Sequence, residues 1–314
     1  MSQMLQIKGL TKRFGAFTAV DNLTFAVDRG EVLGFLGPNG AGKTTAMRMV
    51  TGFLPPTSGT AIIDGFDVTV EPIEVKRRIG YLPEGAPLYE DMTPLELLSF
   101  VADVRGIGGA AKSDAVAKAA ARISIENVLH QSIGTLSKGY KRRVGIAQAI
   151  LHDPDVLILD EPTDGLDPNQ KHEVRKLINT MARDKVIVIS THLLEEVEVV
   201  CTRAIVIANG KIVADGSPIE LEARSIYHNA VAIRVTCDQA ENCRTRIQSL
   251  EGVANVELIA DDSRISEIIA FPSDGQIILE KINDQLRGSG IDVEQVRVER
   301  GRLDEVFRRL TTAA

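Results

Sequence analysis

The chain has few of the features that mark membrane-spanning, secreted or metal-binding proteins. None of its apolar runs approaches the length of about 18 residues that a bilayer-crossing helix needs. The residues after Met1 lack the apolar core of a secretory signal peptide. The three cysteines, Cys201, Cys237 and Cys243, do not have metal-ligand spacing, and so few cysteines are typical of a reducing compartment. We therefore expect a cytoplasmic protein.

Basic residues are also in the minority. The net charge of −7 at pH 7 argues against a nucleic-acid partner. With 44% hydrophobic and 25% charged residues, the composition is that of an ordinary globular protein. A length of 314 residues favours two domains over one.

The segment Gly37–Thr45 carries the most specific pattern in the chain. It fits G-x-x-x-x-G-K-[ST] and lies between an apolar stretch, Glu31–Leu36, expected to be a strand, and Thr45–Val50, expected to begin a helix. Glycines let the backbone curl so that its N–H groups face phosphate oxygens, and the helix N-terminus adds positive potential. The predicted nucleotide contacts are Gly37, Asn39, Gly40, Ala41, Gly42, Lys43, Thr44 and Thr45.

Within this P-loop, two side chains have distinct chemical tasks. The Lys43 ammonium can reach the β- and γ-phosphates, and the Thr44 hydroxyl can bind Mg²⁺. The alternative, a flexible glycine turn before a helix, would need none of this chemistry. The sequence therefore predicts binding of a nucleotide triphosphate, with ATP and Mg²⁺ as the expected ligands.

A second apolar stretch, Val156–Leu159, ends in two acids, Asp160 and Glu161. A continuous apolar run is typical of a parallel strand buried on both faces, and such sheets bind ligands at the carboxyl ends of their strands. Asp160 is then placed to hold Mg²⁺ through water, and Glu161 to orient or deprotonate the water that attacks the γ-phosphate. Taken without the P-loop, the same residues would fit a solvated strand end leading to a turn at Pro162.

Two further segments identify a family. Leu136–Tyr140 precedes the acidic strand and is followed by a helical run, and His192 follows another apolar strand, Val186–Ile189. With the motifs in this order, the chain resembles the ATP-binding-cassette (ABC) ATPases over roughly residues 4–217. The resemblance implies an α/β P-loop NTPase domain at 1–218, with a helical subdomain at about 88–150.

By this resemblance, Leu136–Tyr140 is the signature motif. Ser137 and Gly139 open a helix, so a hydroxyl and free N–H groups face outward at its positive end. In the family, that end closes on the γ-phosphate held by a second copy. The usual motif has glycine and glutamine where this chain has Lys138 and Tyr140, and we do not expect the extra charge of Lys138 to abolish closure.

The resemblance also assigns the residues that surround the nucleotide. His192 is the switch histidine, which hydrogen-bonds the γ-phosphate and supports Glu161 as catalytic residues beside Lys43. Phe14 is the aromatic that stacks on adenine. Glu84 stands where the family has the Q-loop glutamine, so that a carboxylate lies beside Mg²⁺ as a possible oxygen ligand. Outside this context, a histidine after a strand and a single phenylalanine would be compatible with purely structural roles.

Two regions complete the first domain. Gly165–Pro168 matches the D-loop, and Thr93–Glu96 has the residues of a helix start in a helical region at 93–125 that Gly106–Gly109 interrupts. The segment Glu84–Gly106 is expected to expose Leu88, Tyr89 and Met92. In the family this region contacts the membrane subunit, and the same residues could instead pack on their own helices.

After Gly216–Pro218 the pattern changes to that of a small α+β domain. We expect a linker at 219–230 and an accessory domain at 231–314. Its predicted strands are Val231–Thr236, Val253–Ile259, Arg264–Phe271 and Asp292–Val298, and its predicted helices are Gln239–Leu250, Asp274–Arg287 and Leu303–Leu310. The βαββαβ order is that of a ferredoxin-like domain. The sequence of this domain contains no catalytic constellation. The roles that remain for it are dimer contacts, regulation, docking to a membrane subunit or simple stabilisation.

The whole chain is similar to the ATPase subunits of the ABC-2 exporter group, which includes drug-resistance and gliding-motility types. The run Tyr81–Glu84, followed by Pro87–Tyr89, and the ending Asp304–Thr311 are similar to those of the gliding-motility type. The resemblance implies a homodimer, or a dimer with a paralogous ATPase, around two Mg-ATP. This dimer would drive a separate ABC-2 integral membrane permease, for export, from the cytoplasmic face of the inner (plasma) membrane.

Two alternatives stay open. One is a mechanotransmission ATPase that moves a periplasmic partner without moving cargo. The other is a soluble ABC-fold ATPase acting on ribosomes or DNA. Ribosome-type members usually carry two cassettes and DNA-repair types a long coiled-coil insertion; this chain has neither, and it is acidic.

Overall fold

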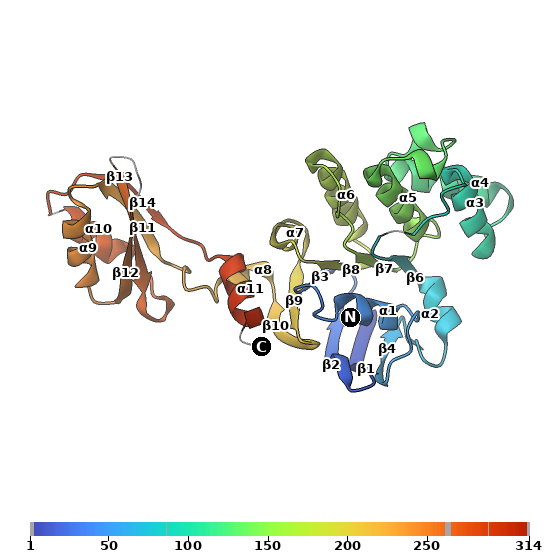
Figure 1. The fold of residues 1–314 in the computed structure, drawn as a ribbon, viewed down its shortest axis with the longest axis horizontal. Coiled ribbons are helices and arrows are strands. Elements are labelled where there is room, and N and C mark those ends of the chain that lie inside the picture. Colours follow the sequence, from blue (N-terminus) through green and yellow to red (C-terminus); the bar gives the residue numbers. More distant parts are fainter. Residues whose placement is uncertain (1–2, 86, 261–264, 288, 313–314) are drawn as a thin grey trace. The chain divides into compact units, whose positions relative to one another are not determined.

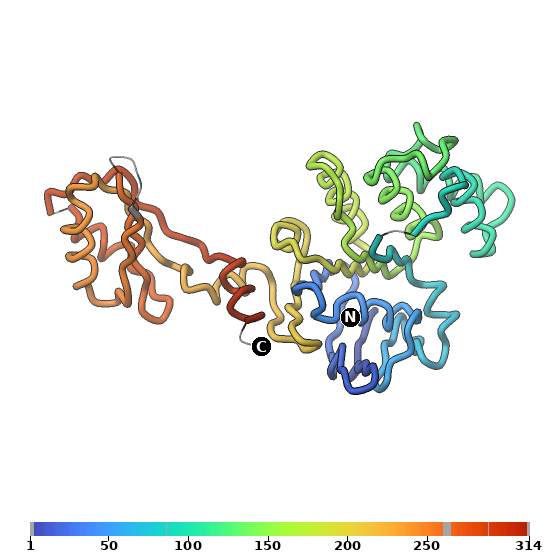
Figure 2. The backbone as a smooth tube through the Cα atoms, in the orientation of Figure 1, coloured from blue at the N-terminus to red at the C-terminus, as the bar shows by residue number. Residues whose placement is uncertain are grey.

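Two separately packed units make up the protein in the computed structural model, which describes residues 3–312 except 86, 261–264 and 288. The described residues up to Pro218 and from Leu310 onward form the first unit, and Ile219–Arg309 form the second. The order of elements along the chain can be followed by colour in Figures 1 and 2.

A six-stranded, largely parallel sheet is the centre of the first unit. Its strand order is β10-β9-β3-β8-β7-β6, with parallel pairs throughout except at the antiparallel edge strand β10. Strands β3, β7 and β8 are buried at every position, which explains their continuous apolar sequences. The bounds are β3 (Val32–Leu36), β6 (Ile79–Leu82), β7 (Val156–Asp160), β8 (Val186–Thr191), β9 (Arg203–Ala208) and β10 (Lys211–Gly216).

A second, antiparallel sheet lies beside it in the order β2-β1-β4-β5. Apolar residues of both sheets and of α1 (Lys43–Val50) share one hydrophobic core. The hairpin of β1 and β2 brings Phe14 to its turn, where it pairs with Phe17. The bounds are β1 (Leu5–Phe14), β2 (Phe17–Val27), β4 (Ser58–Ile63) and β5 (Phe66–Asp67).

Helices α3, α4 and α5, drawn in teal and green in Figure 1, lie within residues 88–150, where the sequence predicts a helical subdomain. Thr93 caps α3 in a capping box with Glu96, as the sequence predicts. The bounds are α2 (Pro72–Arg78), α3 (Pro94–Val104), α4 (Gly109–Arg122), α5 (Lys138–Ile150), α6 (Pro168–Met181) and α7 (Leu194–Val200). Among the described residues, no helix has both the length and the apolar character of a membrane crossing.

The second unit contains the predicted order of elements, β11-α9-β12-β13-α10-β14. Its antiparallel sheet has the order β12-β13-β11-β14, and α9 and α10 pack apolar residues on one core with the sheet. The bounds are β11 (Val231–Thr236), α9 (Ala240–Gln248), β12 (Val253–Ala260), β13 (Ile265–Pro272), α10 (Leu279–Arg287) and β14 (Val293–Val298). The predicted first residue of the third strand, Arg264, lies outside the described residues.

The helix predicted at Asp274–Arg287 was placed too early. Ser273–Gly275 form a 3₁₀ turn, and α10 begins only at Leu279. Asp274 and Gly275 have φ angles of 55° and 67°, and left-handed residues in succession cannot continue a right-handed helix. Ser-Asp-Gly is a turn sequence that the helical spacing of the later apolar residues concealed.

The segment 219–230, which the sequence predicts to be a linker, contains secondary structure and side-chain contacts of its own. It contains most of α8 (Pro218–Glu222). The Tyr227 ring packs edge-on against Phe271, with 5.3 Å between the ring centroids. The Arg302 guanidinium lies over the Tyr227 ring, 3.8 Å from its centroid. The backbone N–H of Ile226 donates to Glu305 of α11 (Leu303–Thr312) at 3.2 Å. The segment is therefore folded against its neighbours.

Candidate functional site

The P-loop connects the end of β3 to the start of α1. Gly40 and Gly42 have φ angles of 81° and 106°, a region that favours glycine. A Cβ on Gly42 would lie 2.5 Å from the carbonyl oxygen of Ala19, and one on Gly37 would lie 2.5 Å from that of Ile207. The loop therefore needs glycine at both ends to fit between β2 and β9, with the N-terminus of α1 at its base.

Lys43 lies inside this loop. Its Nζ donates hydrogen bonds to the carbonyl oxygens of Gly37 at 2.7 Å and Pro38 at 3.3 Å. Burial lowers the pKa of Lys43, while the nearby carboxylates of Glu161, Asp160 and Glu84 act in the opposite direction. The ammonium is thus held where the P-loop curls and faces the acidic end of β7.

Glu161 and His192 meet at the ends of the adjacent strands β7 and β8. Glu161 Oε2 lies 2.9 Å from His192 Nδ1, and Glu161 Oε1 lies 3.9 Å from Lys43 Nζ. Glu161 has a φ of 51°, a conformation that is uncommon for residues other than glycine and that often occurs at functional sites. The structure therefore brings together the three side chains that the sequence predicts to be catalytic.

The predicted Mg²⁺ ligands present oxygen atoms at the same place. Asp160 is fully buried; one carboxylate oxygen accepts a hydrogen bond from the Ser190 hydroxyl, and Oδ2 has no hydrogen-bond partner. The Thr44 hydroxyl donates to Glu84 Oε2 at 3.5 Å. A buried, unpartnered carboxylate oxygen with a hydroxyl and a second carboxylate fits Mg²⁺, which prefers hard oxygen ligands. Within the described chain, no cluster of three or more His, Cys, Asp or Glu could hold a metal by itself, so phosphate and water would have to complete the shell.

The signature residues lie at the start of α5. The Ser137 hydroxyl caps the helix by accepting from the Tyr140 N–H at 3.3 Å. A Cβ on Gly139 would lie 2.1 Å from the side-chain amide of Gln170 of α6, so a larger residue there would require that side chain to move. Lys138 pairs with Asp164 at 3.0 Å, and this contact lowers the pKa of Asp164. Among the described residues, neither Ser137 nor Gly139 shares a hydrogen bond with the P-loop.

Phe14 stands at the outer end of β1. Its side chain is 49% exposed, and Lys12 Nζ lies 5.2 Å from the ring centroid. The ring is therefore not part of the core, and about half of its surface is open to solvent.

Comparisons with known proteins decide the family. A family model described as ABC transporter matches residues 20–164. The chain is 32% identical over 309 residues to Nod factor export ATP-binding protein I of Ralstonia nicotianae, covering 98% of this chain and 94% of that protein. The chain belongs to the ATP-binding proteins of ABC transporters. The family prediction is confirmed.

Other relatives agree with this ABC assignment. The chain is 37% identical over 223 residues to a probable multidrug ABC transporter ATP-binding protein of Escherichia coli (strain K12), covering 71% of this chain and only 38% of that longer protein. A solved ATP-binding subunit of an ABC transporter superposes with a TM-score of 0.65 at 32% identity, covering 70% of this chain and 92% of the other. These matches confirm the ABC ATPase fold of the first unit.

The sequence interpretation missed two residues of the ABC site. Ser190 bonds the Asp160 carboxylate, and its only sequence signal is its place two residues before His192. Arg142 of α5 is buried and donates to backbone carbonyls at the end of β7, including that of Asp160 at 2.6 Å. Burial lowers the pKa of Arg142, opposed mainly by Asp164. In the sequence Arg142 belongs to a Lys-Arg-Arg run, a pattern that is typical of exposed helix positions.

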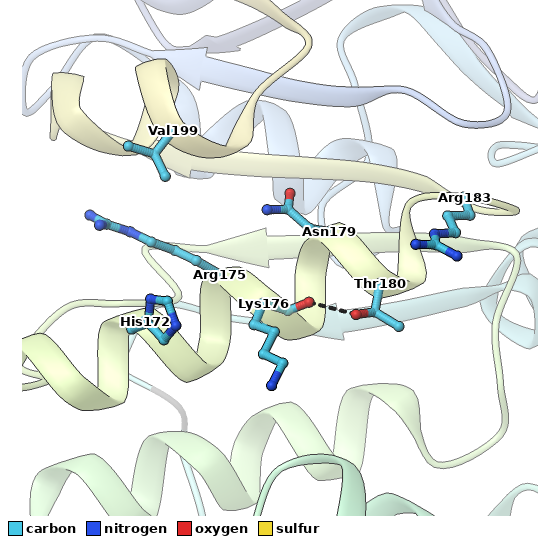
Figure 3. Close-up of a pocket in the computed structure, with 7 residues that line it drawn as sticks. All are labelled: His172, Arg175, Lys176, Asn179, Thr180, Arg183 and Val199. Carbon is cyan, nitrogen blue, oxygen red and sulfur yellow. Dashed lines mark hydrogen bonds between the residues drawn. The ribbon is translucent and has the colours of Figure 1, made fainter.

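A separate cavity lies between α6 and α7. It has a volume of about 330 Å³ and is lined by basic side chains of α6, among them Arg175 and Lys176, and by Val199 of α7 (Figure 3). None of the predicted site residues lines it. The predicted nucleotide contacts therefore lie outside this cavity.

The geometry of Gly42 predicts the effect of a single methyl group. Gly42→Ala must adopt a left-handed backbone and press its Cβ on the Ala19 carbonyl, so we expect ATP affinity to fall by about tenfold or more. Gly65→Ala, in the turn between β4 and β5, is the matched control, because Gly65 also has a positive φ, of 83°, but no atom within 4 Å of the new Cβ. Titration with a fluorescent ATP analogue measures both. An unchanged affinity in Gly42→Ala would show that the loop can relax.

Proposed function

We propose that this chain is the ATP-binding and ATP-hydrolysing subunit of an ABC-2 type transporter, which drives a separate membrane permease in export. The observation that carries the proposal is Glu161, whose carboxylate lies between His192 Nδ1 and the buried ammonium of Lys43. A carboxylate so placed beside a P-loop can accept a proton from water at the γ-phosphate. The printed functions of the relatives, multidrug transport and Nod factor export, support export.

Each side chain has a definite part in this hydrolysis. The P-loop N–H groups and Lys43 bind phosphate oxygens, and the flexible lysine stem lets Nζ exchange the carbonyls of Gly37 and Pro38 for phosphate. With a carboxylate at 2.9 Å, His192 Nδ1 is the donating nitrogen, and this bond fixes the direction of Glu161. Glu161 then takes the proton of the attacking water.

Three residues would hold Mg²⁺ in this site: Thr44, Asp160 and Glu84. The ion, when bound, neutralises charge on the phosphate oxygens. Asp160 presents its unpartnered Oδ2 and is oriented by Ser190. Glu84 adds a negative charge where the family has a neutral glutamine, so it would strengthen attraction for the cation and oppose approach of the phosphates.

Two copies of the chain, or this chain and a paralogue, would complete each site. Ser137 and Gly139 start a helix whose N–H groups suit a phosphate, yet within one described chain they share no hydrogen bond with the P-loop. A second chain that places its signature helix against the first P-loop would meet this need. Phe14 would stack on the adenine from the open side.

Contact with the permease is proposed at the segment after Glu84. Tyr89 is 60% exposed and meets the exposed ring of Phe100 edge-on at 6.3 Å, whereas Leu88 and Met92 are half-buried, contrary to the expectation that all three are exposed. Exposed aromatic rings are typical of protein interfaces. This would hold the protein peripherally at the cytoplasmic face of the inner membrane.

Replacing Glu161 by glutamine tests the proposed chemistry. Glu161→Gln keeps the size of the side chain but cannot accept a proton, so we expect steady-state ATP hydrolysis to fall by about 100-fold or more while ATP binding persists and a dimer accumulates. Glu195→Gln, a change at an exposed glutamate on α7, is the control and should retain activity. Near-normal turnover in Glu161→Gln would refute the assigned role.

The permease proposal has its own test at Tyr89. Tyr89→Ala removes an exposed ring, so we expect the protein to lose most of its membrane partner in affinity purification from detergent extracts while its own ATP hydrolysis stays within about twofold. Val199→Ala, at an exposed residue of α7, is the control. Copurification of ribosomes or nucleic acid in place of a membrane protein would favour the soluble alternative. Retention of the membrane partner by Tyr89→Ala would remove this segment from the interface.

A further inference from the structure

Arg142 is a buried arginine that bonds backbone carbonyls and no carboxylate. Its side chain is only 5% exposed. Nη2 donates to the carbonyl oxygen of Asp160 at 2.6 Å and also to that of Glu161, and Nε donates to that of Pro162 at 3.3 Å. Arg142 forms no ion pair with an Asp or Glu among the described residues, although the charge of Asp164 and of other nearby carboxylates partly offsets the effect of its burial. A guanidinium is costly to bury, so its retention here calls for a reason beyond packing.

The three accepting carbonyls belong to consecutive residues at the point where the chain leaves β7. Glu161, in the middle, has the left-handed φ of 51°. Such a conformation persists only where the surroundings over-determine it. Arg142 bonds the carbonyls of Glu161 and of both its neighbours, and the planar fork of a guanidinium suits several acceptors at once.

The same side chain also reaches a second motif. Arg142 Nη1 lies 3.4 Å from the carbonyl oxygen of Pro83, the residue before Glu84. Arg142 itself stands five positions after Ser137 on α5, whose N-terminus is the signature motif. One buried side chain of α5 therefore bonds both the segment before Glu84 and the end of β7.

We propose that Arg142 is a positioning residue: its guanidinium holds the backbone around Glu161 so that the carboxylate faces His192 and Lys43, and it makes this placement depend on the position of α5. The inference rests on the proposed role of Glu161 in hydrolysis. A movement of the signature helix, on meeting a second chain, is then transmitted directly to the backbone of the catalytic carboxylate.

Conservative variants of Arg142 test this directly. In Arg142→Gln, which cannot span three carbonyls, we expect the kcat of ATP hydrolysis to fall about tenfold or more while KM for ATP stays within about twofold. Arg142→Lys keeps the charge but reaches fewer acceptors, so its kcat should lie between that of Arg142→Gln and that of the unsubstituted protein. Arg143→Gln is the matched control, because the adjacent guanidinium hydrogen-bonds the carbonyls of Ile123 and Ser124, at 3.5 Å, and lies over the Tyr140 ring, without a hydrogen bond to the described residues at the end of β7.

A double substitution separates positioning from simple destabilisation. If Arg142 acts through Glu161, Arg142→Gln added to Glu161→Gln should lower the residual single-turnover rate by less than about twofold. The inference would be overturned if Arg142→Gln lowered the hydrolysis rate by the same factor with Glu161 present and with Glu161→Gln. It would also be overturned if kcat were unchanged in both Arg142 variants. Should Arg142→Gln fail to fold, Arg142→Lys carries the same comparison. Failure of the proposed function would show separately, as near-normal turnover in Glu161→Gln alone.

Discussion

The register of three parallel strands is the constraint on which the site depends. Strand β8 lies between β3 and β7, with Thr191 paired to Leu36 on one side and Ser190 paired to Asp160 on the other. Parallel strands end at one edge of a sheet, so this register places the loop after β3, the histidine after β8 and the acids of β7 together. Shifting one strand by a single residue would turn its side chains to the opposite face and separate these groups.

The same strand register brings charged groups of both signs together. The edge of the sheet gathers carboxylates from β7 and from Glu84, and two largely buried cations, Lys43 and Arg142, lie among them. Lys43 lies within the P-loop, whereas Arg142 bonds backbone carbonyls at the end of β7. The first cation is thus suited to bind the nucleotide, and the second to hold Glu161.

The parts of the structure that local sequence patterns specify were predictable. The P-loop, the capped start of α3 and the alternating strand β11 depend on residues close in sequence. The bonds of Arg142 could not be predicted, because they join residues about twenty or more positions apart and because a buried arginine and an exposed one look alike in a helical run. The start of α10 was predicted too early for a related reason: turn chemistry outweighed the periodicity of the apolar residues there.

The two residues that depart from the family's usual motifs, Lys138 and Glu84, each make a specific contact in the structure. Lys138 pairs with Asp164 of the same chain, so its extra charge is directed towards the D-loop side. Glu84 bonds the Thr44 hydroxyl and so keeps an oxygen atom at the predicted metal position. Neither substitution disturbs the contact between Glu161 and His192.

The central claim is that each active site is shared between two chains, and mixing two inactive proteins tests it most directly. Lys43→Ala disables the P-loop of its own chain, and Ser137→Arg disables the signature helix that the same chain offers to its partner. A mixed dimer has one site with both lesions and one site with neither. The account predicts that the mixture recovers ATP hydrolysis that neither variant shows alone. A mixture as inactive as its components, with mixed dimers shown to form, would contradict a shared site.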